Sequence, residues 1–316
     1  LQNIRDLAVV MVEVESGEIV AYCGNSDMSF EREGKWVDIA RANRSSGSIL
    51  KPLLYTVALQ EGIILPETLL PDVPTDFRGF TPKNFDGTYA GAIAADEALA
   101  LSLNIPNVHL LKAYGVARFA ETLQRAGFVS LNRSTDKYGL SLVLGGAEVC
   151  LCDVVSCYAR MAACYIDTTA YAEFPLRDRV ALYHTFNAMR EVNRPDQMDW
   201  RRATSVQNVA WKTGTSYGSR DAWAIGVTPQ YVVGVWVGNA DGSGVAELTG
   251  ARIAGPILFD MLNLLSYSEW FAEPCSTDGV TLKVCVHSGH LAGRYCTDTK
   301  EVLLPRNSVK SLSCPY

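Results

Sequence analysis

Strand-like segments stand at both ends of the chain, with helix-like segments between them, and this order limits the folds available. Residues 7–14 and 18–22 form a predicted hairpin, and further strands are predicted at 208–212, 222–227 and 231–237. Helices are expected near 94–101, 107–114, 117–126, 150–165, 176–190 and 254–266. This arrangement predicts an α+β fold, an antiparallel sheet flanked by helices, whose first and last strands are neighbours. The proline-rich connection 64–89 is expected to lack regular structure and to shape a cleft.

Length and composition are those of an ordinary globular protein with a large core. The chain has 316 residues, of which 48% are hydrophobic and 20% charged, and its formal net charge is −6. The negative balance argues against nucleic acid as a partner and against a basic membrane-binding surface. No stretch approaches the ~20 apolar residues of a membrane span. Any function must therefore be read from short motifs.

The first motif is a serine and a lysine three residues apart, Ser48 and Lys51, which open an apolar stretch. A helix is expected to begin near Ser48 with Pro52 in its first turn, because apolar residues follow at helical spacing: Leu50, Leu53, Leu54 and Val57. Both side chains would share one face, and a partly buried Lys51 amine could act as the base for the Ser48 hydroxyl. A helix cap beside a solvated lysine is the competing interpretation. The same spacing recurs at Ser134 and Lys137, in a polar stretch that is expected to be a surface loop.

Two further motifs could complete a site around Ser48. Ser102 and Asn104 lie on a short loop between two helical stretches. Ser102 could relay a proton, and Asn104 could hold the lysine and a substrate amide. A helix cap is the alternative for Ser102, and residues 130–132 repeat the pattern.

The third motif, Lys212-Thr213-Gly214-Thr215, occurs once and ends a predicted strand. Lys212 and the two threonine hydroxyls could bind a carboxylate, and Gly214 would let a ligand approach the strand edge. The backbone N–H groups of Thr215 and Ser48 could form an oxyanion hole. The alternative is an exposed lysine before a turn.

The nine cysteines fall into two groups. Cysteines in apolar stretches are expected to be buried core thiols rather than ligands of an iron–sulfur cluster: Cys23, Cys150, Cys152, Cys157 and Cys164. The other four lie in a loop-rich tail and are candidates for two disulfides of unknown pairing: Cys275, Cys285, Cys296 and Cys314. Zinc is the alternative, because His287 and His290 stand beside Cys285, although the spacing matches no common zinc module. We favour disulfides and assign no metal ligand.

All three motifs, in this chain order, form the set found in penicillin-binding proteins and class A β-lactamases. The sequence resembles the transpeptidase domain of class A penicillin-binding proteins of the 1C-type branch. The matching runs are residues 44–52, 69–75, 82–86, 138–148, 212–217, 220–226 and 235–238. The cysteine-containing tail also resembles the segment that follows that domain in this branch. Ser46 stands where the family usually has proline and Ile49 where threonine is common, and neither position carries the chemistry.

The resemblance implies a β-lactamase/transpeptidase-like fold with a helical subdomain. It also implies a D,D-transpeptidase that cross-links peptidoglycan stem peptides, is acylated by β-lactams and needs no cofactor. Ser48 would form the acyl-enzyme, with Lys51 and Ser102 moving protons and Lys212, Thr213 and Thr215 holding the terminal carboxylate. The location would be extracytoplasmic, on the periplasmic side of the inner membrane, with membrane contact only through an N-terminal anchor. Other cell-wall synthesis proteins would be its partners.

Residues 1–268 are expected to form the transpeptidase domain and residues 269–316 a cysteine-containing C-terminal extension. The glycosyltransferase domain and membrane anchor of class A proteins are expected to be absent, so polymerising activity should be lacking. A β-lactamase is disfavoured because no glutamate stands in the Glu-x-x-Leu-Asn setting that would activate a deacylating water. A D,D-carboxypeptidase, a non-catalytic scaffold and a β-lactam sensor remain as alternatives.

Overall fold

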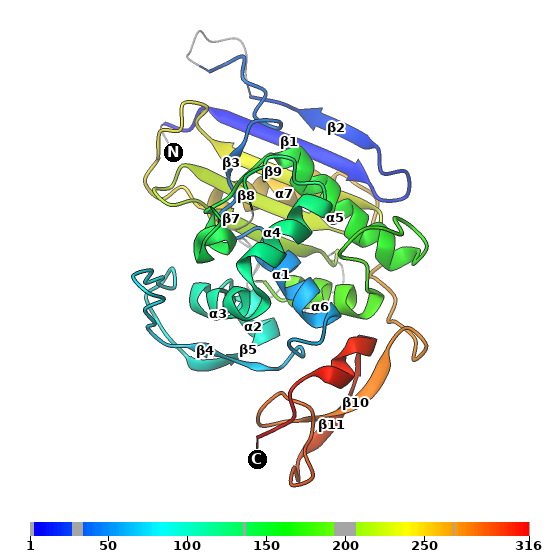
Figure 1. Cartoon of the computed structure of the whole chain (residues 1–316). Coiled ribbons are helices and arrows are strands. Elements are labelled where there is room, and N and C mark those ends of the chain that lie inside the picture. The colour runs from blue at the N-terminus through cyan, green and yellow to red at the C-terminus, as the bar shows by residue number, and fades with distance from the viewer. Residues whose placement is uncertain (1–2, 27–33, 135–136, 193–206, 268, 316) are drawn as a thin grey trace.

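A five-stranded antiparallel sheet forms the centre of the computed structural model, which describes residues 3–26, 34–134, 137–192, 207–267 and 269–315 (Figure 1). Its strand order is β2-β1-β9-β8-β7. The bounds are Asp6–Glu13 for β1, Ile19–Cys23 for β2, Ala210–Thr215 for β7, Asp221–Val227 for β8 and Tyr231–Gly238 for β9. The predicted pairing of the first and last strands is confirmed, because β1 lies antiparallel to β9 with Asp6 opposite Gly238.

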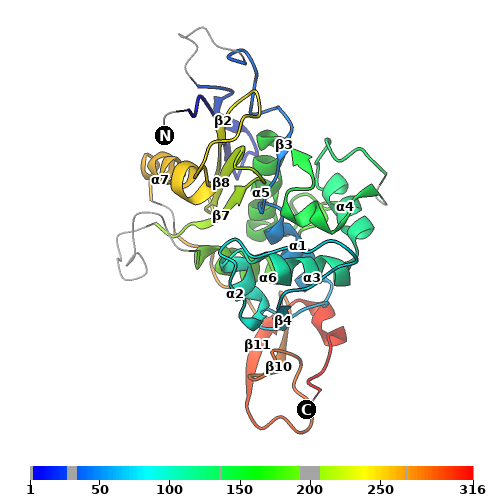
Figure 2. The same cartoon turned by 90° about the vertical axis from the view of Figure 1, so that its left-hand side faces the viewer.

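Both faces of the sheet are buried. Along β1, Ala8 and Val10 belong to the core on one face, whereas Val9 and Met11 belong to the core on the other. Helix α5 (Leu151–Ile166) covers the first face and helix α7 (Gly255–Asn263) covers the second, as Figure 2 shows. The sheet is therefore the middle layer of a three-layer domain.

The remaining helices build a subdomain beside the α5 face of the sheet (Figure 1). Their bounds are Lys51–Gln60 for α1, Ala95–Ala100 for α2, Asn104–Tyr114 for α3, Val116–Arg125 for α4 and Arg179–Arg190 for α6. Helix α1 packs on α6 and α3, and α6 also packs on β7. The α+β prediction with a helical subdomain is confirmed. None of the helices in the described ranges is long and apolar enough to cross a membrane.

The connection 64–89 is more regular than predicted. Its β4 strand (Leu69–Asp72) pairs antiparallel with β5 (Gly91–Ala94), directly before α2. Pro71 lies within β4, which forms a sheet of only two strands, and such an edge position tolerates proline. The prediction of a loop without regular structure is wrong for these four residues because their pairing partner is far along the chain.

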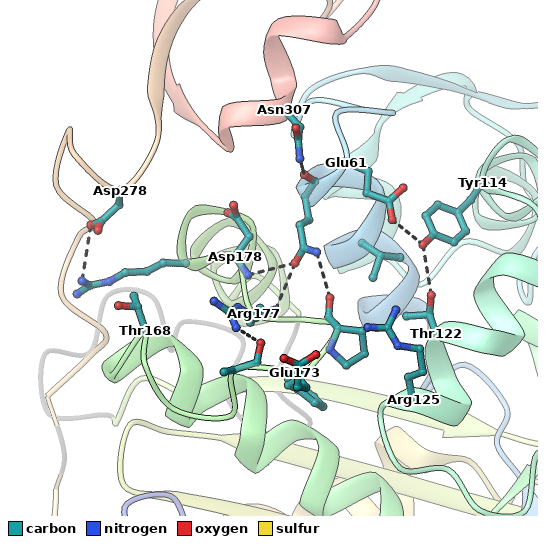
Figure 3. Close-up of a pocket in the computed structure, with 16 residues that line it drawn as sticks. Glu61, Tyr114, Thr122, Arg125, Thr168, Glu173, Arg177, Asp178, Asp278 and Asn307 are labelled. Carbon is teal, nitrogen blue, oxygen red and sulfur yellow. Dashed lines mark hydrogen bonds and ion pairs between the residues drawn. The ribbon is translucent and has the colours of Figure 1, made fainter.

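The C-terminal extension is a small hairpin unit that packs against the helical subdomain. Strands β10 (Val280–Cys285) and β11 (Thr299–Leu304) pair antiparallel, and their buried apolar centre is Leu65, Val284 and Leu304. A cavity of about 540 Å³ lies where this unit meets the subdomain (Figure 3). There Asn307 donates to the Gln60 carbonyl at 3.0 Å and Arg179 lies 3.6 Å from Asp278. This cavity is at the C-terminal end of α1, whereas Lys51 begins the helix.

Some sequence expectations fall outside the described residues. These are Thr135 and Asp136 of the second Ser-x-x-Lys match, residue 268 at the expected domain boundary, and Tyr316.

Candidate active site

Ser48 lies in a turn directly before α1, and three neighbours fix that turn. Short strands β3 (Arg44–Ser45) and β6 (Glu148–Val149) pair just before it. The indole N–H of Trp223 on β8 donates to the Ser45 carbonyl at 2.8 Å, and the Tyr158 hydroxyl on α5 donates to the Ile49 carbonyl at 2.8 Å. The central sheet, helix α5 and strand β6 therefore all hold the turn that carries Ser48 in place. Helix α1 begins at Lys51 rather than near Ser48, with Pro52 in its first turn as predicted.

The turn packs so closely on strand β7 that glycine is required on both sides. Gly47 has φ +51, and a Cβ there would lie 2.7 Å from the Thr215 nitrogen. A Cβ on Gly214 would lie 2.8 Å from the Ser46 carbonyl oxygen and 3.4 Å from the Ser48 nitrogen. Gly214 therefore makes room for the turn that carries Ser48, a contact that its sequence setting did not suggest. Because of this packing, the turn that contains Ser48 lies directly against the end of β7 that contains Thr215.

The Lys51 amine is buried and meets the second motif. Lys51 is 0% exposed, and its Nζ donates at 2.7 Å to the Ser102 carbonyl and at 2.7 Å to Asn104 Oδ1. The Ser102 hydroxyl oxygen lies 3.5 Å from this amine. Among the described residues, the hydrogen bonds of the amine run to this loop and not to the Ser48 hydroxyl. The predicted contact between Lys51 and Asn104 is present, and the Ser102 hydroxyl also lies close to the amine.

The Lys212 amine reaches the same serine from the opposite side. Lys212 is 1% exposed on the edge strand β7, and its Nζ donates to Ser102 Oγ at 2.7 Å and to the Thr213 carbonyl at 2.8 Å. The alternative of an exposed lysine before a turn is therefore excluded. One hydroxyl now lies between two lysine amines, which come from a helix and a strand far apart in the sequence.

Burial lowers the pKa of both amines. The pKa of Lys51 lies well below its usual value because burial destabilises the ammonium form, and the nearby Lys212 charge lowers it further. Burial lowers the pKa of Lys212 to about 7. The pair therefore does not retain two positive charges at neutral pH, so a neutral amine is available as a base.

The loop that carries Ser102 is held in an uncommon backbone conformation. Ser102 has φ +56, in the left-handed region that residues with a Cβ rarely adopt. Asn84 secures the following helix because its Oδ1 accepts the Asn104 N–H at 2.9 Å and its Nδ2 donates to Asp72 Oδ1 at 2.7 Å. The Asn104 amide also donates to the Lys83 carbonyl at 2.7 Å. The segment 64–89 thus braces the loop that carries Ser102.

Sequence reasoning assigned no role to several residues that shape the site. Asn84 and Asp72 are 3% and 1% exposed. Both lie in runs that match the family, but nothing in the local sequence indicates that these polar side chains are buried. Tyr158 and Trp223 lie in apolar stretches and resemble ordinary core residues until their polar atoms are placed. Of the predicted carboxylate-binding residues, Thr213 and Thr215 are both half-buried on β7, and the Thr215 hydroxyl accepts the Gly250 N–H at 3.1 Å.

The structure separates the four tail cysteines. The sulfur atoms of Cys285, Cys296 and Cys314 all lie within 4.8 Å of one another, whereas exposed Cys275 is outside this group. All four thiols are free in the structure. Hydrogen bonds from Ser288 and from the His287 backbone lower the pKa of Cys285 to about 6. Cys150, Cys157 and Cys164 are buried free thiols, and Cys23 and Cys152 are half-buried.

Comparison with known proteins defines the class. The sequence profile of the penicillin binding protein transpeptidase domain matches residues 7–263, so the chain belongs to the penicillin-binding protein transpeptidase family. Penicillin-binding protein 1C of Escherichia coli K12 is 37% identical over 291 residues, covering 90% of this chain and 38% of that protein. Penicillin-binding protein 1A of Neisseria cinerea is 27% identical over 285 residues, covering 80% of this chain and 35% of that protein. The chain thus spans little more than a third of these curated relatives.

Solved structures share the fold. PonA1 from Mycobacterium tuberculosis, in complex with penicillin V, superposes with a TM-score of 0.70 at 23% identity, covering 87% of this chain and 82% of that one. Penicillin-binding protein 1A from Haemophilus influenzae gives a TM-score of 0.74 at 20% identity, covering 95% of this chain and 53% of that one. The β-lactamase/transpeptidase-like architecture is therefore confirmed.

Proposed function

We propose that this chain is a serine D,D-transpeptidase that cross-links peptidoglycan through an acyl-enzyme on Ser48. The observation that carries the proposal is the buried Lys51–Ser102–Lys212 arrangement beside the turn of Ser48. Two buried amines with lowered pKa values supply a base without histidine. The membership of the transpeptidase family supports this function.

In the acylation step, Ser48 Oγ attacks the carbonyl carbon of the penultimate D-alanine, and its proton passes to the neutral Lys51 amine. The backbone N–H groups of Ser48 and Thr215 stabilise the oxyanion. The C–N bond then breaks, the leaving amine takes a proton through the Ser102 hydroxyl, and D-alanine departs. An amine from a neighbouring stem then attacks the ester carbonyl and loses a proton to Lys51. The ester C–O bond breaks as the new amide forms, and Lys51 passes that proton to Ser48 Oγ, which restores the hydroxyl.

Substrate recognition follows from the edge strand. Lys212, with the hydroxyls of Thr213 and Thr215, would bind the terminal carboxylate of the stem, which restores the positive charge on Lys212. Asn104, anchored to Lys51 and Lys83, would hold a substrate amide. A β-lactam presents the same carboxylate and a strained amide, so it would acylate Ser48. The reaction as written uses no metal or organic cofactor.

The wider setting is also proposed from the resemblance and the relatives. Residues 1–268 would be the transpeptidase domain and residues 269–316 an extension, which agrees with a family match that ends at 263. The enzyme would work on the periplasmic side of the inner membrane, where stem peptides and other cell-wall synthesis proteins are found. A D,D-carboxypeptidase uses water in place of the acceptor amine, and a scaffold or sensor would lack turnover.

Intact mass spectrometry after incubation with benzylpenicillin tests the chemistry. The chain should gain one ligand mass, and the Ser48→Ala variant should gain none. D-alanine release from a pentapeptide stem, with and without an acceptor amine, then separates the activities. Formation of a cross-linked product supports transpeptidase activity. D-alanine release at the same rate with and without the acceptor amine, and without cross-linked product, indicates a carboxypeptidase. A penicillin adduct that persists in Ser48→Ala would contradict the assignment of Ser48 as the nucleophile. If no D-alanine is released at all, the proposal that the chain is an enzyme would be wrong.

A further inference from the structure

Three cysteines from separate segments of the extension meet at one point. Cys285 ends β10, Cys296 lies in the turn before β11, and Cys314 follows the last helical turn. Their sulfur atoms are within 4.8 Å of one another, and Cys285 and Cys314 are 3% and 8% exposed. The backbone locks the three segments together, since Cys314 donates its N–H to the Leu291 carbonyl at 2.7 Å and Cys285 to the His290 carbonyl at 2.9 Å. We call these three residues the cysteine cluster.

A backbone N–H group faces one sulfur of the cysteine cluster, and a tight turn shapes the backbone next to another. The Gly293 N–H points at the Cys296 sulfur at 3.3 Å. The loop 285–290 is a tight turn, with the Gly289 N–H bonded to the Cys285 carbonyl at 2.9 Å and Gly289 at φ +66. Backbone N–H groups that face a sulfur stabilise its negative form, and this form binds metals.

The extension also needs a cross-link that its apolar core does not supply. In the part of the chain that the structure describes, its fully buried apolar cluster consists of Leu65, Val284 and Leu304, and Leu65 comes from the transpeptidase region. Three partly buried side chains pack against it: Leu282, Leu291 and Val302. Small units with so little apolar burial are usually held by disulfides or by a structural metal. A disulfide would use two of the three clustered sulfurs and leave a third thiol against them, whereas a metal ion uses all three.

We propose that Cys285, Cys296 and Cys314 bind one zinc ion that holds the extension together. Tetrahedral coordination at a Zn–S distance of about 2.3 Å places ligand sulfurs about 3.8 Å apart, which the cluster already permits. Three thiolates select zinc among the common divalent ions, and each thiol releases its proton as the metal binds. Neither His287 nor His290 places a ring nitrogen within the cluster, so the fourth ligand is water or another side chain.

This site would fasten the extension to the segment that shapes the cleft. A Cβ on Gly289 would lie 1.7 Å from the Glu67 carbonyl oxygen, so the 285–290 turn lies directly against that backbone. The Thr68 hydroxyl donates to the Gly289 carbonyl at 3.3 Å, and the Leu69 N–H donates to the Ser288 carbonyl at 3.4 Å. Leu69 begins β4, which ends at Asp72, the partner of Asn84.

Metal analysis of the whole chain tests the proposal, and Cys275→Ser is the matched control. The chain is purified under reducing conditions without an affinity metal, incubated with zinc sulfate, and passed through a weak chelator. We expect about one zinc ion per chain in the unaltered protein and in Cys275→Ser. We expect at least about a tenfold lower content in Cys285→Ser and Cys314→Ser. No bound zinc in the unaltered chain, or zinc that persists in both cluster variants, would overturn the site.

A second measurement avoids reliance on variants that fold poorly. Iodoacetamide labelling of the unaltered chain, mapped by peptide mass, should modify Cys275 and spare the cluster until a strong chelator is added. Cobalt substitution should give thiolate-to-metal charge-transfer absorption. A disulfide between two cluster cysteines in the natively purified chain, or equal labelling with and without chelator, would replace the metal site with the disulfide or free-thiol alternative.

Discussion

The active site and the cysteine cluster are stabilised in opposite ways. Lys51 and Lys212 are fully desolvated by a large domain, with three tryptophans and several aromatic side chains completely buried around the sheet and helices. The cysteine cluster belongs to a unit whose own apolar cluster is small, with Val284 and Leu304 buried against Leu65 of the transpeptidase region. The large core can tolerate two buried amines and a serine at φ +56, which cost stability, because apolar burial elsewhere exceeds that cost. In the extension the chemically active side chains are themselves the proposed source of stability.

Because of this difference, substitutions in the active site and in the extension should have different consequences. A change in the active site should remove activity and leave the fold intact or more stable. A change in the extension should loosen the fold locally and leave Ser48 chemistry nearly intact.

The largest effect is expected for Lys51→Met. The substitution removes the base but fills the buried site with an apolar chain of similar length, so the second-order rate of penicillin acylation should fall by roughly 10²–10⁴-fold. The melting temperature should stay equal or rise, because an amine is no longer buried. Stopped-time mass spectrometry and thermal unfolding measure the two quantities. An unchanged acylation rate would remove Lys51 from the mechanism, and a large fall in melting temperature would mean that the amine stabilises the domain.

Leu304→Ala should show the converse pattern. Leu304 is 0% exposed within the small core of the extension, so its truncation should cost about 2–5 kcal/mol of local stability. Hydrogen exchange in residues 280–304 should accelerate strongly, while the acylation rate changes by less than about twofold. A matched loss of acylation would show that the extension controls the cleft.

Gly47→Ala tests the close packing of the Ser48 turn on β7. Gly242→Ala is the control, because Gly242 also has a positive φ of +75 but nothing lies within 4 Å of its added Cβ. Both variants bear a backbone cost of about 1 kcal/mol, but only Gly47→Ala also forces Thr215 away from the turn. Acylation should therefore slow by at least about tenfold in Gly47→Ala alone. Equal rates in the two variants would show that the spacing between Ser48 and Thr215 does not matter.

The pH dependence of stability should report the titration of Lys212. Lys212 has a folded-state pKa of about 7, whereas its unfolded value is 10.5. The unfolded chain therefore binds more protons between these values, and the unfolding free energy should rise with pH across that window by up to about 1.4 kcal/mol per unit. Below about pH 7 this contribution is constant. Lys212→Met should flatten the rise relative to the unaltered chain in urea titrations. Parallel pH profiles would mean that Lys212 is not titrating near 7.

Pattern in the sequence was sufficient for the main sheet and most helices because their apolar residues repeat with a clear period. The β1–β9 pairing, α5 and α6 were all predictable in this way. The site motifs were predictable because Ser48, Lys51, Ser102, Asn104 and Lys212 occupy a known order and spacing. The structure brings Lys51, Ser102, Asn104 and Lys212 into direct contact.

What sequence could not predict depends on contacts between distant segments. The pairing of β4 with β5 and the Asp72–Asn84–Asn104 chain have no local signature. Gly214 was given a role toward a ligand, although the atoms that exclude a side chain there belong to Ser46 and Ile49. The cysteine tail is the sharpest case, because spacing alone suggested four equivalent thiols, and only the fold separates Cys275 from the other three.

The pairing of β1 with β9 has a consequence for the order in which the protein folds. The hydrogen bond from the Ala240 N–H to the Asp6 carboxylate joins residues 234 positions apart. During synthesis, β1 can pair early with β2, but its other edge must wait for a strand made near the end of the family region. Such non-local pairing slows folding and leaves an apolar strand edge exposed in the growing chain. A chain shortened anywhere before β9 would therefore lack the strand that joins the β1–β2 hairpin to the rest of the sheet, and it would not be a smaller working domain.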